Sequence, residues 1–133
     1  MNIPSIKCKI EMFCSVNPSE DSQKIINTIS NIFPLSNIEF QNFSVVASSR
    51  DLRSFEKIYE AIHNKRSQKT YRKYLEKNYE NSSTWFYLNK QAAYVGKIAI
   101  CEQDEESPLG PIKVVISSPD LDRIIEWIAF GND

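Results

Sequence analysis

The chain has 133 residues, of which 41% are hydrophobic and 25% are charged, and its formal net charge is −1. These values predict a single globular domain, residues 1–133, whose core is large enough to form without a structural metal or disulfides. A nearly neutral chain lacks the strong overall field that attracts nucleic acids or anionic lipids to a whole molecule.

The first part of the chain shows two strand patterns separated by a helix pattern. Apolar side chains stand at every even position in residues 6–16, which predicts a strand with one buried face. The motif Asn17–Pro18–Ser19–Glu20 is typical of a helix start, and Pro34 ends the helix. Residues 38–46 predict a second strand, with a bulge or a break near Asn42 where the alternation slips.

The middle of the chain predicts two helices followed by two strands. The helices occupy residues 51–80 with a polar joint at residues 64–67, although one continuous helix also fits this pattern. The strands follow at residues 85–88 and 97–101. Between them, residues 89–96 fit either a helical turn or part of a bulged strand.

The last part of the chain predicts a loop, a strand and a helix. Residues 102–110 form an acidic loop, and residues 112–116 alternate as a final strand. Ser118 precedes Pro119 and two aspartates, which predicts the start of the last helix. The whole order favours an α+β fold, with a mostly antiparallel sheet of about five strands and helices packed on one face.

The cysteines and the apolar runs indicate the cellular compartment. Cys8 and Cys14 lie about 20 Å apart on one predicted strand, too far for a disulfide, and Cys101 has no CxxC partner. No apolar run approaches the roughly 18 residues of a membrane span, and residues 1–5 lack a signal-peptide pattern. We therefore expect buried, reduced thiols in a cytoplasmic protein that contacts no membrane.

Catalytic and metal-binding motifs are scarce in this sequence. The single histidine, His63, lies near the end of a predicted helix, where a solvated side chain is favoured over a general base. Phosphate-binding glycine loops and zinc-ligand spacings do not occur. The carboxylates of residues 102–106 lack the spacing of a calcium loop and are interpreted as a solvated turn. We therefore expect no metal, no cofactor and no enzyme activity, and an enzyme that acts on a small metabolite is the third alternative.

The charge of the chain is unevenly distributed. The segment from Arg50 to Lys77 holds nine basic and four acidic residues, a local net charge of +5. Within it, residues 65–77 hold six bases and one acid, and the bases recur at spacings of three and four, which places them on one side of a helix. Such a side can pair with phosphates while Tyr71 and Tyr74 stack on bases. The alternative is a solvated outer face with both tyrosines turned to the core.

The aromatic run Trp85–Phe86–Tyr87 leaves a similar choice. Aromatic side chains on a strand can form a base-stacking platform, as on some RNA-binding sheets. Because no glycine-aromatic motif of the RNP type accompanies this run, core packing or a protein interface is the favoured interpretation.

Several motifs together resemble a known family. The run FYLNKQAAYVG at residues 86–96 continues as KIAICE and later as ESPLGPIKV. With the helix end at residues 32–34 and the final helix at residues 122–129, these motifs resemble a family of small archaeal proteins that are predicted to bind RNA. The fold of that family is similar to that of ribosomal protein five of the large subunit. The resemblance implies one α+β domain of that type, a role near RNA and a homodimer in at least some members.

These observations predict a non-enzymatic, RNA-associated binding module that uses a basic helical surface. The alternative is a protein-interaction or scaffold domain in a cytosolic complex, without direct contact to nucleic acid. For the RNA-binding hypothesis, basic side chains contact phosphates, and amides near residue 90 add a second patch that equally fits a role in holding the neighbouring loop. The candidate residues are Arg50, Arg53, Lys65, Arg66, Lys69, Arg72 and Lys73 in the first patch and Asn89, Lys90, Gln91 and Lys97 in the second.

Overall fold

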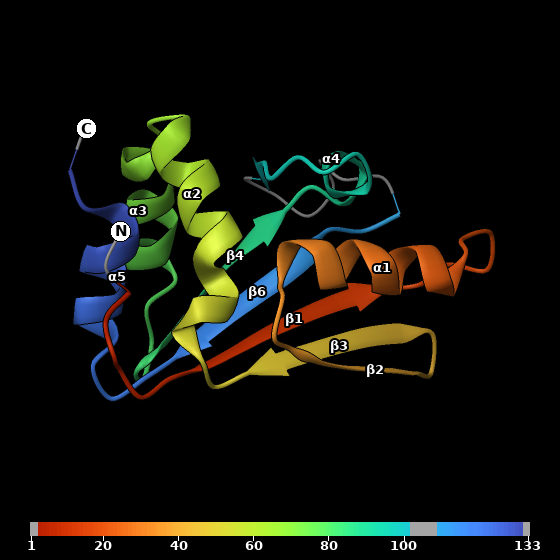
Figure 1. The fold of residues 1–133 in the computed structure, drawn as a ribbon, viewed down its shortest axis with the longest axis horizontal. Helices are drawn as coiled ribbons and strands as arrows, with labels where there is room; N and C mark the ends of the chain where they lie inside the picture. The colour runs from red at the N-terminus through yellow and green to blue at the C-terminus, as the bar shows by residue number, and fades with distance from the viewer. Residues whose placement is uncertain (1–2, 102–108, 132–133) are drawn as a thin grey trace.

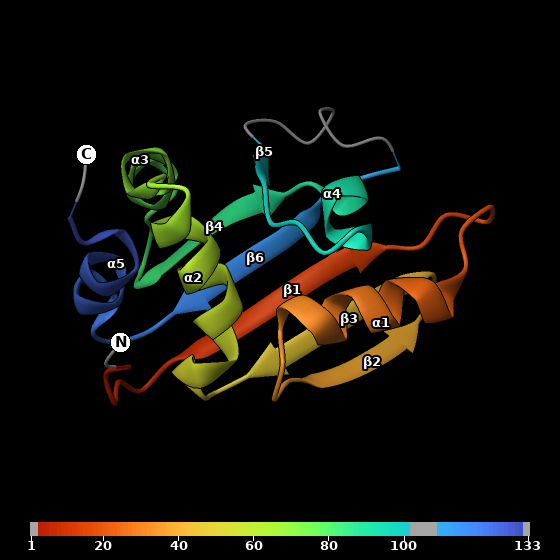
Figure 2. The same ribbon diagram turned by 45° about the horizontal axis from the view of Figure 1, so that its top comes forward.

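A computed structural model describes residues 3–101 and 109–131, which form a layer of helices on one face of an antiparallel sheet. In Figures 1 and 2, α1, α2 and α4 lie on the same side of the sheet, and α3 and α5 pack side by side at one end. The strands are β1 (Lys9–Ser15), β2 (Asn37–Gln41), β3 (Ser44–Ser49), β4 (Ser83–Leu88), β5 (Ile100–Cys101) and β6 (Ile112–Ser117). The helices are α1 (Ser22–Ile32), the 3-10 turn η1 (Leu52–Phe55), α2 (Glu56–Asn64), α3 (Gln68–Lys77), α4 (Lys90–Tyr94) and α5 (Leu121–Ala129).

The sheet has the strand order β2-β3-β1-β6-β4-β5, and all neighbours in the described residues pair antiparallel. Side chains alternate along each long strand, so that Ile10, Met12, Val114 and Phe86 are buried under the helices while their neighbours in sequence face the other side. The predicted α+β fold with helices on one face is therefore confirmed. The sheet contains six strands where the sequence predicted about five, because residues 37–49 form a hairpin and not one strand.

The turn of this hairpin lies at the position where the sequence alternation slips. Gln41 pairs with Ser44, which leaves the two-residue loop Asn42–Phe43, and both loop residues have positive φ angles of 54° and 57°. Two such residues match a type I′ turn, whose twist suits a β-hairpin. The slip at Asn42 therefore marks a break and not a bulge.

The first helix begins later than the sequence predicted. Asn17 and Glu20 form a separate turn, in which the Glu20 backbone N–H donates to the Asn17 carbonyl at 2.8 Å and the Asn17 N–H donates to the Glu20 carboxylate at 3.0 Å. The helix itself starts at Ser22, and the Asp21 side chain caps it by accepting from Gln23 N–H at 2.9 Å. Asn17 and Glu20 of the predicted helix start are thus paired with each other, and the Glu20 carboxylate lies in the interior of the protein.

His63 is half-buried at the joint of three helices and is not a solvated helix-end residue. The Nε2 atom lies 2.8 Å from the Ile128 carbonyl oxygen, and Nδ1 lies 3.1 Å from Nε2 of Gln68. Since a carbonyl only accepts, Nε2 carries the proton and Nδ1 accepts from the Gln68 amide. The ring also stacks on Tyr59 at 4.0 Å, so His63 fastens α2 to α5.

The cysteines follow the prediction of buried, reduced thiols, since Cys8, Cys14 and Cys101 are buried and none of them forms a disulfide within the described residues. Burial raises the pKa of Cys14 to about 11, the Glu20 charge also raises it, and the Lys90 charge opposes this. Among the helices that the structure describes, none is both long and apolar enough to cross a membrane. The predicted acidic loop at residues 102–106 lies outside the described residues.

Candidate nucleic-acid interface

Helix α3 turns its lysines outward and its tyrosines inward. Lys69, Lys73 and Lys77 recur every four residues on the exposed side, and the opposite side buries Tyr71 and Tyr74. The Nζ atoms of Lys73 and Lys77 lie 5.4 and 5.9 Å from the centre of the Tyr74 ring. The tyrosines therefore belong to the core and are not available to stack on bases, and the lysines remain as a row of charges.

A hollow of about 450 Å³ on the helix side brings the two predicted basic patches together. Its lysines are Lys57 and Lys65 at the two ends of α2 and Lys97 in the loop after α4, and Glu60 is the carboxylate among its lining residues. Lys65 and Lys97 are far apart in the sequence, yet the Lys65 Nζ donates to the carbonyl of Ile98 at 3.0 Å. The ends of both patches therefore meet at one concave surface.

Local geometry explains why these lysines converge. Lys57 and Lys65 are separated by about two helical turns and so lie on the same side of α2. The loop after α4 turns sharply at Gly96, whose φ angle of +76° strongly favours glycine, and the Lys97 N–H donates back to Ala92 at 2.9 Å. This turn places Lys97 beside the end of α2.

Of the two amide side chains in the second patch, Asn89 stabilises the local structure of α4 and its loop. The Asn89 side chain accepts from the Ala92 N–H at 2.8 Å and so caps α4, and the Asn89 N–H donates to Ala99 at 2.8 Å. Gln91 is half-buried on α4. Residues 90–94 are helical, which decides between the two sequence interpretations of this block. The Asn89 amide thus holds the loop that carries Lys97.

Lys90 lies inside the protein, with no exposed side-chain surface. Its ammonium group donates to the carbonyls of Ser15 at 2.9 Å and Leu109 at 2.7 Å, and it pairs with the Glu20 carboxylate at 3.1 Å. This burial corrects the expectation for Lys90, because a buried ammonium group that is paired in this way cannot meet a phosphate that approaches from solvent.

The Glu20 carboxylate is the centre of this buried cluster. Burial by itself would raise the pKa of Glu20, but hydrogen bonds from the Tyr94 hydroxyl, the Asn17 backbone and side chain and the Lys90 ammonium lower it to about 2. The Tyr94 hydroxyl donates to Glu20 at 2.6 Å, and burial followed by this bond raises the pKa of Tyr94. The cluster joins the end of β1, the turn before α1, helix α4 and the residues before β6.

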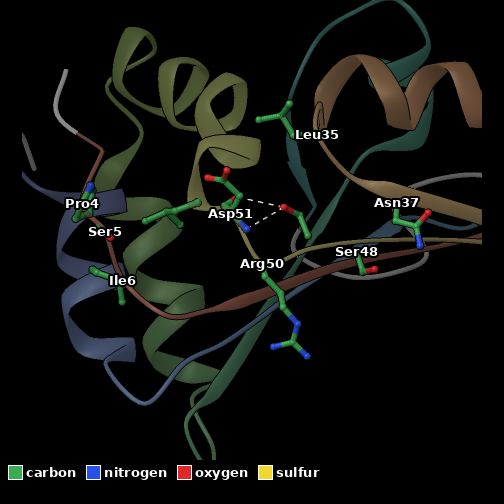
Figure 3. Close-up of a pocket in the computed structure, with 10 residues that line it drawn as sticks. Pro4, Ser5, Ile6, Leu35, Asn37, Ser48, Arg50 and Asp51 are labelled. Atoms are coloured by element: carbon green, nitrogen blue, oxygen red, sulfur yellow. Dashed lines mark hydrogen bonds between the residues drawn. The ribbon is translucent and has the colours of Figure 1, made fainter.

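Three of the four predicted arginines differ in their surroundings. Arg53 is exposed and pairs with the Asp51 carboxylate at 2.6 Å. Arg72 is half-buried, donates to the carbonyl of Ala129, and lines a hollow with Glu76, Asp122 and Glu126, so its surroundings are acidic. Arg50 is exposed at the end of β3, and Figure 3 shows its side chain pointing away from Leu35 and Asp51.

The structure thus separates the candidate residues by accessibility. Lys65, Arg66, Lys69, Lys73 and Lys97 are exposed around α2, α3 and the α4 loop. Lys57 was not among the candidates, although its spacing of eight residues from Lys65 was a usable signal. Asn89 caps α4, Lys90 is buried against Glu20, and Arg72 lines a hollow whose other charged residues are carboxylates.

Comparison with known proteins places this geometry in a family. Residues 9–118 match a family model that is described as RNA binding. The UPF0201 protein of Sulfurisphaera tokodaii is 40% identical over 124 residues, which cover 90% of this chain and 86% of that protein. The UPF0201 protein of Sulfolobus acidocaldarius is 38% identical over 117 residues, which cover 85% and 81%.

Solved structures agree with this assignment. The crystal structure of the UPF0201 protein from Methanococcus jannaschii superposes with a TM-score of 0.77 at 29% identity, covering 94% of this chain and 95% of that one. Family members carry no enzymatic name. The chain therefore belongs to the archaeal UPF0201 family, and most of its length matches the RNA-binding family model.

Proposed function

We propose that this protein is a non-enzymatic, cytoplasmic RNA-binding module that grips phosphates with the basic surface around the α2 hollow. The contacting residues are Lys57, Lys65 and Lys97 in the hollow, with Arg66, Lys69 and Lys73 beside it and Arg50 and Arg53 at the β3–η1 corner. The function needs no cofactor, since positioned positive charges suffice to bind a polyanion.

One observation carries the proposal: lysines from two distant segments line a single hollow. Exposed lysines of two separate segments repel each other, so their convergence in one hollow is unfavourable when no anion lies between them. A phosphate group placed among them removes that repulsion. The match to the RNA-binding family model supports a nucleic acid as the source of that phosphate.

The salt dependence of RNA binding tests this proposal. The dissociation constant of a labelled, unstructured oligouridylate is measured by fluorescence anisotropy between about 50 and 200 mM KCl. The logarithm of the affinity is expected to fall linearly with the logarithm of the salt concentration, with a slope of about −0.7 for each phosphate contact to a single strand. A flat slope would contradict phosphate binding.

The double variant Lys57→Gln/Lys97→Gln locates the contacts. It removes two charges from the hollow while leaving the Lys65 bond to Ile98 in place. The slope is expected to become shallower by about 1.4, since each lost phosphate contact to a single strand changes it by about 0.7. Arg123→Gln is the matched control, because Arg123 is equally exposed but pairs with Asp120 on α5. If the control weakens binding as much as the double variant, the hollow is not the site.

A second candidate function is a protein-interaction or scaffold domain, with a second copy of this chain as the simplest partner. It is favoured by the face of the sheet opposite the helices, where Phe13 is 38% exposed and Trp85 and Tyr87 are partly exposed. Sedimentation of the purified protein and a nuclease-treated pull-down separate the two functions. Partners that survive nuclease treatment, together with no binding of free RNA, would favour the scaffold.

A further inference from the structure

The face of the sheet that the helices leave open is a regular array of side chains. Across neighbouring strands, Phe13 on β1 stands opposite Lys113 on β6, which stands opposite Tyr87 on β4. In the next row Glu11 stands opposite Val115, which stands opposite Trp85. Strands lie about 4.8 Å apart, so these rows form one surface about 10 Å wide across three strands.

This array has an aromatic part with a positive charge over it. The Trp85 and Tyr87 rings lie 5.0 Å apart and are inclined by 55°, and the Lys113 ammonium lies 4.8 Å from the centre of the Trp85 ring. Of the two carboxylates that the described strands place on this face, Glu11 pairs with Lys9 at 3.6 Å, and Glu39 lies on the edge strand β2, two strands from Phe13. The charged group beside the Trp85 ring is therefore the Lys113 ammonium, which is positive.

Exposure separates these aromatics from those of the core. Phe55 and Phe86 are buried, whereas Phe13 is exposed and Trp85 and Tyr87 are partly exposed. Figure 1 shows the helices on one side of the sheet, and the alternation of buried and unburied residues along β1 and β4 puts these three side chains on the other. An aromatic ring with an accessible face and a neighbouring cation is suited to stack on a nucleobase while the cation meets a phosphate.

We propose that the helix-free sheet face binds unpaired nucleotides of single-stranded RNA, with bases stacked on Phe13 and Trp85 and a phosphate held by Lys113. This inference rests on the proposed RNA-binding function and adds that the protein selects single-stranded RNA over duplex RNA. Arg50 and Arg53 are exposed where β3 leads into η1 and α2. One strand of RNA that passes this corner meets cations on both sides.

The chemistry of the face favours RNA over a second copy of this chain. β1 and β6 are the central strands, so a sheet-to-sheet dimer would bury Glu11 and Lys113 at the centre of its interface. Interface centres are depleted of charged residues because desolvating a charge is costly. A single strand of RNA uses the Lys113 charge, and Glu11 keeps its pairing with Lys9 at the surface.

The test uses the fluorescence of Trp85. The chain has two tryptophans, and Trp127→Phe leaves Trp85 as the only one. Addition of unstructured oligouridylate to this variant is expected to quench the tryptophan emission, because a stacked base is in contact with the ring. A perfectly paired RNA duplex of the same length is expected to leave the emission unchanged, since its bases are not available for stacking.

Two phenylalanine variants give an independent readout. Phe13→Ala removes a partly exposed ring from the open face, and Phe40→Ala removes a ring that is 44% exposed on β2, on the helix side of the same sheet. Phe13→Ala is expected to weaken binding of the single strand by about 5- to 150-fold, the effect of one lost stacked base, and Phe40→Ala is expected to have no effect. Circular dichroism of both variants verifies that they are folded.

The outcomes separate this inference from the function on which it rests. Steep salt dependence with unchanged Trp85 emission, and equal binding by both phenylalanine variants, would overturn the sheet proposal and leave the basic hollow standing. If no RNA binds at any salt concentration, both proposals fail. A dimer in sedimentation that Phe13→Ala dissociates, without any change in Trp85 emission on RNA addition, would assign the face to a second copy.

Discussion

At the residue scale, charge alone did not identify which side chains are available to a ligand. Lys90 and Lys97 are both lysines of one short block, yet one is buried against Glu20 and the other is exposed at the hollow. The partner of Lys90 is Glu20, which belongs to the predicted helix start at residues 17–20. Nothing in the spacing of 70 residues between them indicated that the two charges would meet.

The Glu20–Lys90 pair gives a prediction on stability. Glu20→Gln leaves the Lys90 ammonium buried without its counter-charge, which is expected to lower the free energy of unfolding at pH 7 by about 3–5 kcal/mol. Urea unfolding followed by circular dichroism measures this loss. Glu126→Gln is the control, because Glu126 is an exposed carboxylate on α5 and its change should cost little.

The same pair fixes the pH dependence of that loss. The folded-state pKa of Glu20 is about 2, below its ordinary value of 4.5, so its stabilising contribution is present above pH 4.5 and disappears as the pH falls toward 2. The stability difference between the wild type and Glu20→Gln should therefore be largest near neutral pH and should shrink between pH 4.5 and 2. A difference that does not change with pH would show that Glu20 acts through its shape and not through its charge.

At the element scale, the β2–β3 hairpin contains a residue that does not suit its backbone. Phe43 has a φ angle of 57° and is 68% exposed, so it has the cost of a left-handed conformation and gains little from burial. Phe43→Gly is expected to raise the free energy of unfolding by about 1 kcal/mol, because glycine adopts positive φ without steric cost.

Chemical denaturation of Phe43→Gly and of Phe40→Gly checks this prediction. Phe40 is also exposed, but it lies within β2 with extended backbone, where glycine is expected to destabilise. If both variants lose stability, the positive φ of Phe43 is not strained in the folded protein.

The elements differ in how far they could be predicted from the sequence. Strands β1, β4 and β6 and both helices in residues 51–80 follow from periodicity, because each has one buried and one open side. The β2–β3 hairpin was missed, since Asn42–Phe43 is not a typical sequence for its turn. The start of α1 was misplaced because the Asn17–Glu20 bonds close a separate turn.

The candidate site was predictable only in part, for a reason of geometry. The local excess of cations is a property of the sequence, whereas their convergence with Lys97 depends on the packing of α4 beside α1 and on the turn at Gly96. The open sheet face follows from register, which places Phe13, Lys113 and Tyr87 in one row. Sequence alternation shows that these side chains share a side of their own strand, but not that they meet across strands.

At the scale of the whole molecule, the net charge of −1 conceals a separation of charge. The basic hollow lies beside α2, whereas Glu76, Asp122 and Glu126 gather around Arg72 between α3 and α5. At physiological salt the Debye length is about 8 Å, so a polyanion responds to the nearer group of charges and hardly to the total. This separation of charge therefore lets one part of the surface attract a polyanion while another part repels it.

If both proposed RNA surfaces, on opposite sides of the sheet, bind RNA, binding depends on RNA length. A short oligouridylate occupies either the basic hollow or the sheet face, whereas a longer one that passes Arg50 and Arg53 reaches both. The second contact is then intramolecular, and such linkage can raise affinity by about 10²- to 10⁴-fold.

Anisotropy titrations with oligouridylates of increasing length should show a steep rise in affinity at one length in the wild type. In Phe13→Ala and in Lys57→Gln/Lys97→Gln the rise should be reduced, because each variant weakens one of the two contacts. A smooth increase with length, equal in all three proteins, would mean that RNA engages a single surface.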